Sequence, residues 1–107
     1  MANPFAGQVE IVIDGRPYAL KLTLGALAGL EQSLGNASLV DLVKRFEEGR
    51  FSAGDILSLL VAGLEGGGHD LRAEDLARAE ISGGPLGAAR IAEQLLARSF
   101  ALPEGQG

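Results

Sequence analysis

The stretch of residues 51–68 limits what this chain can fold into more than any other. An uncharged and mostly aliphatic run extends over residues 56–64. Ser52 and Asp55 precede it with the spacing of a capping box, and the glycines at 66–68 supply a place where a helix can end. A helix that is apolar on nearly every side must be covered on nearly every side. Because the run falls far short of the roughly 20 apolar residues that cross a bilayer, we expect a central core helix and not a membrane span.

Composition places the chain among small acidic proteins. It has 107 residues, no cysteine and a net charge of -5, with a pI near 4.7. This length supports one domain, 1–107, with a real core. The lack of cysteine excludes a disulfide scaffold, a thiolate zinc site and a thiol nucleophile. The acidic balance argues against nucleic acid, whose phosphates are neutralised by Lys and Arg. Residues 1–7 have neither the basic segment nor the apolar run of a secretion signal, so we expect a cytoplasmic protein.

An N-terminal β-hairpin is predicted over residues 8–24, after a loose arm over residues 1–7. Apolar and polar residues alternate on both sides of Asp14-Gly15, which is a strong signal for a two-residue hairpin turn. Such a turn pairs Ile11 with Tyr18, Val9 with Leu20 and Val12 with Pro17. Pro17 has no amide hydrogen, which suits an edge strand. A lone hairpin is marginal in water, so this one must lie on helices or gain strands from another copy of the chain.

Helices are predicted for the region 25–101, because the apolar period lengthens there from two to about three and a half residues. Caps and glycines divide it into about five short helices: from Leu24 to Leu34, after Ser38, after Ser52, over 70–81, and over 85–100. Residues 102–107 form a loose tail. The predicted fold class is α+β, mainly α, with an N-terminal β-hairpin followed by helices packed around the central apolar helix.

No group of residues in the sequence favours catalysis, a cofactor or a metal ion. His69 is the only histidine, and Asp70 alone does not complete a metal site. The serines have no Gly-x-Ser-x-Gly turn and no general base beyond that histidine. A carrier protein would place its modified serine directly after an aspartate at a helix start, but Ile56 follows Asp55 and Ser58 comes later. We therefore expect neither an enzyme nor a bound cofactor.

The order of elements as a whole resembles a known family. The residues that carry the resemblance are Asp14-Gly15-Arg16-Pro17-Tyr18, Ala26-Leu27-Ala28-Gly29-Leu30-Glu31, Ser38-Leu39-Val40-Asp41-Leu42 and Phe46-Glu47-Glu48-Gly49. Over about residues 8–100, this pattern is similar to the small tail assembly chaperones of gene transfer agents and related prophages of alphaproteobacteria. Some members of that family are labelled as tail tube proteins. A tube subunit is generally built around larger sheets, and one hairpin in a mainly helical chain fits a chaperone better.

The resemblance implies non-catalytic work during assembly of a phage-like tail. Such a chaperone binds the helix-rich tape-measure protein and keeps it soluble until tube subunits polymerise around it. The alternative is a structural tube or connector component that stays in the particle, and a third hypothesis is an unrelated helical adaptor or carrier. A helical groove can shelter an apolar helix. The residues predicted to bind the partner, each of which could instead be ordinary core, are Leu57, Leu60, Leu64, Leu95, Leu96 and Phe100.

Self-association is a further expectation from the sequence. The hairpin has an edge strand, and the apolar helical surface exceeds what a small monomer easily covers, so a homo-oligomer through either surface is predicted as possible. No membrane or nucleic acid partner is expected. The sequence leaves open whether a longer, frameshifted form of the chain exists.

Overall fold

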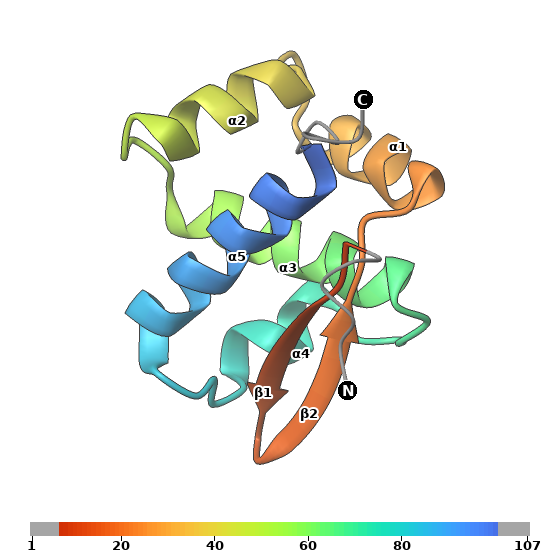
Figure 1. The fold of residues 1–107 in the computed structure, drawn as a ribbon, viewed down its shortest axis with the longest axis vertical. Coiled ribbons are helices and arrows are strands. Elements are labelled where there is room, and N and C mark those ends of the chain that lie inside the picture. The colour runs from red at the N-terminus through yellow and green to blue at the C-terminus, as the bar shows by residue number, and fades with distance from the viewer. Residues whose placement is uncertain (1–6, 101–107) are drawn as a thin grey trace, which may run out of the picture.

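Helix α3 (Ala53–Gly66) runs through the middle of the molecule, and the other elements lie around it (Figure 1). The computed structural model describes residues 7–100, so the predictions for the rest of the N-terminal arm and for the tail fall outside the described residues. The remaining elements are β1 (Val9–Ile13), β2 (Arg16–Leu20), α1 (Leu24–Ser33), α2 (Leu39–Glu47), α4 (Ala73–Arg78) and α5 (Gly84–Phe100). This arrangement confirms the predicted α+β, mainly α, fold.

Capping residues determine where three of the helices begin. The hydroxyl of Ser52 accepts the amide of Asp55 at 3.1 Å, and the Asp55 carboxylate accepts the Ser52 amide at 2.9 Å. Ser38 and Asp41 form the same reciprocal pair at the start of α2. At α1, the Thr23 hydroxyl accepts the amide of Ala26. These bonds satisfy first-turn amides that have no partner inside the helix, so each of these three helices starts where its capping residue lies.

The hairpin has the predicted register. Val9 pairs with Leu20, Ile11 with Tyr18 and Val12 with Pro17 in one antiparallel sheet of two strands. The turn residues Asp14 and Gly15 both have positive φ, at 51° and 81°, as a type I′ turn requires. One face of the hairpin is buried against the helices, with the side chains Val9, Ile11, Ile13 and Leu20 in the core.

Both edges of this small sheet make backbone contacts with other parts of the chain. On the β1 side, the amide of Asp14 donates to the carbonyl of Glu80 at 2.8 Å. The amide of Ser82 donates to the carbonyl of Val12 at 3.1 Å. On the β2 side, the amide of Lys21 donates to the carbonyl of Gly63 in α3 at 3.0 Å. The hairpin is therefore supported by the helical part of the chain on each side.

The glycines at the end of α3 allow the helix to touch β2 directly. A Cβ on Gly66 would lie 1.8 Å from the carbonyl oxygen of Lys21, and one on Gly67 would lie 2.1 Å from that of Ala19. Gly68 takes the left-handed conformation just after the helix, with φ of 88°. The prediction that this glycine run ends the helix is confirmed. Its second role, a close contact between helix and strand, was not predicted.

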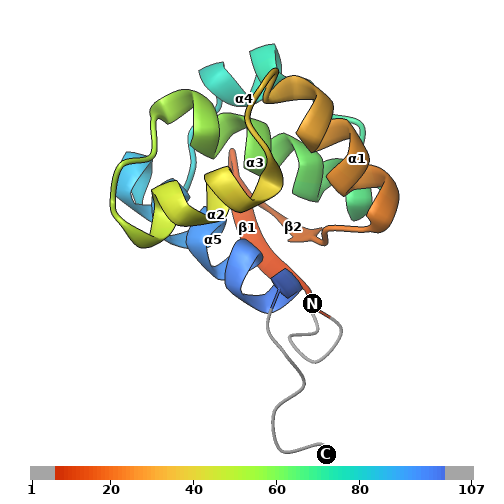
Figure 2. The same ribbon diagram turned by 90° about the horizontal axis from the view of Figure 1, so that it is seen from above.

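Helix α3 is central because it packs against α1, β2, α4 and α5. Its buried side chains include Leu59, Leu60 and Leu64, and α5 adds Leu95 and Leu96. Seen from above, α5 lies along β1 on one side of α3, while α1 lies on the other side (Figure 2). No helix within residues 7–100 is long and apolar enough to span a membrane.

The fourth helix is shorter than predicted. A helix over residues 70–81 was expected, but α4 covers only Ala73–Arg78. The backbone at Ala79 turns extended, and Ile81 then forms a bridge with Ile13 of β1. The segment after α4 is thus extended because it pairs with the edge of the hairpin, a contact with residues far away in the sequence.

Candidate partner-binding surfaces

Among the hollows formed by residues 7–100, two are lined mostly by apolar side chains. The larger, called here the α3–α4 groove, has a volume of about 740 Å³ and lies between the first half of α3, α4 and the segment that leads into α5. Its larger aliphatic lining residues are Ile56, Leu57, Leu60, Leu76 and Ile81, and among the described residues Glu80 is its only charged one. The smaller, called the α2–α5 cleft, has a volume of about 320 Å³.

The α2–α5 cleft combines an apolar floor with acidic side chains. Its lining consists of Val43, Phe46, Glu47, Glu93, Leu96, Ala97 and Phe100. On each helix these residues recur at three and four positions, so they form one stripe along α2 and one along α5. Both glutamates are exposed, one on each helix. The cleft can therefore accept an apolar group and present carboxylates to a cationic one.

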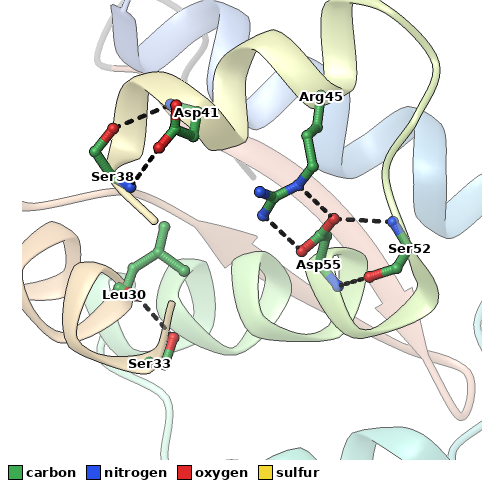
Figure 3. A network of polar contacts seen from close by, with 7 residues as sticks. All are labelled: Leu30, Ser33, Ser38, Asp41, Arg45, Ser52 and Asp55. Carbon is green, nitrogen blue, oxygen red and sulfur yellow. Dashed lines mark hydrogen bonds and ion pairs between the residues drawn. The ribbon is translucent and has the colours of Figure 1, made fainter. Parts of the chain in front are cut away.

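Helix α2 is held to α3 by an ion pair and to the segment just before α3 by an aromatic stack. The Arg45 guanidinium donates from Nε and Nη2 to both oxygens of Asp55, at 3.0 and 2.9 Å (Figure 3). The rings of Phe46 and Phe51 stack with their centroids 4.6 Å apart, and Leu42 is fully buried beneath the helix. These contacts hold one wall of the cleft at a defined distance from the rest of the core.

The Asp55 carboxylate is stabilised in its charged form. Burial raises its pKa, but hydrogen bonds from Arg45 and from the Ser52 amide, together with the positive charge of Arg45, lower it further than burial raises it. The net pKa is therefore below the ordinary value for aspartate. Bonds from Ser38 similarly lower the pKa of the exposed Asp41. Both shifts belong to structural caps, since neither carboxylate lines a hollow.

The residues predicted to bind a partner do not form one surface. Leu60, Leu64, Leu95 and Leu96 are buried in the core of the monomer, although Leu60 and Leu96 also touch a hollow. Leu57 is half-buried in the α3–α4 groove, while Phe100 is 43% exposed at the α2–α5 cleft. Leu57 and Phe100 are thus accessible to a partner, each in a different hollow. A binding role for the six stays a prediction.

Several surface residues were not singled out from the sequence. Val43, Glu47 and Glu93 line the cleft together with the predicted Leu96 and Phe100. The spacing of residues along α2 could have indicated the cleft residues of this helix. Val40, Val43 and Glu47 recur there at i, i+3 and i+7 beside the buried stripe. Val40 is 63% exposed although it is aliphatic.

The residues considered for metal binding do not gather in the structure. Within residues 7–100, no three His, Cys, Asp or Glu side chains come together as a metal site would need. His69 lies after the end of α3, where its ring meets that of Tyr18 edge-on with centroids 5.0 Å apart. The apolar hollows are therefore the surface features of the described residues that best fit a binding role.

Comparison with known proteins adds one family. Residues 6–102 match the model of the family described as "Phage tail tube protein, GTA-gp10". Neither the curated proteins nor the solved structures gave a match. The matched range covers almost the whole chain, including the hairpin and all five helices of the described residues.

Proposed function

Because this chain belongs to the family of phage tail tube proteins described as GTA-gp10, it has a role in a phage-like tail, and we propose that this role is that of an assembly chaperone. In this proposal it binds the tape-measure protein in the cytoplasm of the host cell and keeps that chain soluble while tube subunits assemble. It uses no cofactor and catalyses no reaction.

The observation that carries the proposal is the size of the sheet and the state of its edges. The described residues contain one sheet, of two strands, and each of its edges makes backbone contacts with another segment of the same chain. A tube wall is generally built around larger sheets, and sheets extend through free edges. A chain with this fold is better suited to binding a helix than to forming a wall of strands.

The two hollows supply places for such a helix. Amphipathic helices bind grooves through apolar residues at i, i+3, i+4 and i+7, and the α3–α4 groove offers Ile56 and Leu57 to residues of that kind. Neither hollow is large, with volumes of about 740 and 320 Å³. A modest interface favours release, and a chaperone must release its client before the particle is complete.

Co-expression with the tape-measure protein tests the proposal. The full chain is expected to increase the soluble fraction of the tape-measure protein and to elute with it in size-exclusion chromatography. An unrelated acidic helical protein of similar size is the control. If the tape-measure protein still aggregates and the chain elutes alone, the chaperone proposal is wrong.

A retained tail component is the second candidate, and the family description favours it because it names a tube protein. Purified particles separate the two candidates. A tube or connector subunit is present in many copies, whereas a chaperone is missing from finished particles. Quantitative mass spectrometry of particles, with a known tube subunit as the internal reference, measures this ratio directly.

A further inference from the structure

We propose that the α2–α5 cleft binds an amphipathic helix of the partner, with apolar side chains between Val43 and Phe100 and a lysine or arginine facing Glu47 and Glu93. The inference rests on the proposed function, because it names the surface and the chemistry by which the chain would hold its helical client. It goes beyond it in selecting this cleft over the larger α3–α4 groove.

The apolar part of the argument comes from two facing stripes. On α5, Glu93, Leu96 and Phe100 recur at i, i+3 and i+7, and on α2 the cleft residues follow the same period. Phe100 leaves 43% of its surface exposed at this position. Large exposed apolar groups at a hollow are typical of sites that bury them against a partner. The space of about 320 Å³ suits a few inserted side chains.

The charged part of the argument comes from the two glutamates. Glu47 and Glu93 are the only charged residues in the cleft lining, and neither forms an ion pair with a residue in the range 7–100. Lys44 and Arg90 lie three residues before them on the same helices, but they do not line the cleft. Two carboxylates beside one hollow repel each other, so a cation between them interacts favourably with both.

The charged and apolar residues of the cleft are spaced along two helices that run in opposite directions. α2 runs from right to left in Figure 1, whereas α5 runs from lower left to upper right, and the view from above shows the same opposition (Figure 2). On α5, Glu93 lies seven residues before Phe100, which is about two helical turns. On α2, Glu47 is the last residue and lies one turn after Val43. A bound helix would thus need its basic residue at one end of its apolar stripe.

The α3–α4 groove gives no comparable indication of its occupant. Glu80 is its one charged lining residue, and the rest of its lining is small or aliphatic. The cleft, in contrast, has a defined pattern of charge and apolar surface. For this reason the cleft is the surface that selects a partner by its chemistry.

Cleft variants in the co-expression assay provide the first test. F100S and the double variant E47K/E93K are expected to lower the soluble fraction of the tape-measure protein. Two matched controls are L24S, which changes an 84% exposed leucine in α1, and E31K/E74K, which makes the same charge change on exposed glutamates outside both hollows. Circular dichroism and thermal unfolding show that each variant is folded. If the cleft variants act like the controls while the wild type still keeps the client soluble, the cleft proposal is wrong and the chaperone proposal stands.

Synthetic helices test the cleft independently of the client. The probe is a fluorescent 18-residue helix-forming peptide with leucines at i, i+4 and i+7 and lysines at one end, and a second peptide has glutamates in place of these lysines. The wild-type chain is expected to bind the lysine peptide about tenfold more tightly, as two surface ion pairs allow. E47K/E93K is expected to reverse that preference. Equal binding of both peptides overturns the proposal, and so does dimerisation of the free chain that F100S abolishes, because the occupant would then be a second copy.

Discussion

At the scale of single residues, the Asp55 side chain serves two elements at once. Its carboxylate closes the capping box of α3 by accepting the Ser52 amide, and it also accepts two bonds from Arg45 of α2. One side chain thereby sets the start of the central helix and the position of its neighbour. Hydrogen bonds to charged groups are worth more than those between neutral ones.

Replacing Asp55 by Asn should make the stability of the protein less dependent on pH. Because the folded pKa of Asp55 lies below its unfolded value of about 3.9, its contribution is present above that pH and is lost as the pH falls through the lower folded pKa. At pH 7 the variant should lose about 1–3 kcal/mol of unfolding free energy. Urea unfolding between pH 7 and pH 2 measures the difference, which should shrink below about pH 4.

Glu74→Gln is the control for this experiment, because Glu74 is an exposed acidic residue in the first turn of α4. Its effect should stay within about 0.5 kcal/mol at every pH. A constant loss for the Asp55 variant from pH 7 to pH 2 would mean that the charge of this carboxylate does not act as described.

At the scale of elements, the contact between α3 and β2 depends on the absence of side chains. Gly66→Ala would place a Cβ against the backbone carbonyl of Lys21, which no side-chain rotation can relieve. The helical preference of alanine, worth about 1 kcal/mol, should be outweighed by overpacking of about 1–3 kcal/mol or more. The variant should therefore be less stable in chemical denaturation.

Gly29→Ala is the matched control inside α1. A Cβ there would meet only the end of the Glu65 side chain, at 3.8 Å. This variant should be more stable than the wild type by about 0.5–1 kcal/mol. If both alanine variants shift stability in the same direction, the close contact of α3 with β2 is not what excludes a side chain at position 66.

Local signals made most of the fold predictable, and distant contacts account for what was missed. Asp14-Gly15 specifies a turn and therefore the register of Ile11 with Tyr18, while Ser52 and Asp55 specify a helix start within one turn of chain. Ile81 lies in a helical pattern by its neighbours, but it pairs with Ile13 of β1. No local spacing reveals such a partner.

The candidate surface was less predictable than the fold. Apolar periodicity identifies the face of a helix that avoids water, but it does not distinguish a core neighbour from a partner. Leu64 and Leu95 fit the helix-in-groove pattern, yet both are fully buried within the monomer. Phe100 is exposed because it lies at the end of α5, beside a cleft whose other wall comes from α2. Only the packing of these two helices creates that surface.

At the scale of the whole molecule, one core joins the hairpin to the helices. Leu64 lies within it at the centre of the fold, with no exposed surface. Leu64→Ala should therefore destabilise the protein by about 2–5 kcal/mol. Leu24→Ala, at an 84% exposed position, should change stability by no more than about 0.5 kcal/mol. Equal effects of the two substitutions in urea unfolding would contradict the central place of α3.

The single tyrosine allows a test of cooperativity. Tyr18 is the only tyrosine and there is no tryptophan, so intrinsic fluorescence reports on the hairpin alone, while far-ultraviolet circular dichroism reports mainly on the helices. Because the hairpin shares its core with the helices, both signals should give the same urea midpoint. A hairpin transition at lower urea would show that β1 and β2 separate from the helices before these unfold.

A ribosome releases the hairpin well before it releases the segment that covers the edge of β1. Asp14 bonds to Glu80, and the two residues are separated by 66 positions in the chain. At synthesis rates of about 5–20 residues per second, a nascent hairpin waits roughly 3–13 s for that contact. During this time the bare edge can pair with the same edge of a neighbouring nascent chain. On a polysome, the speed of translation therefore sets how long each copy is open to misassembly with the next.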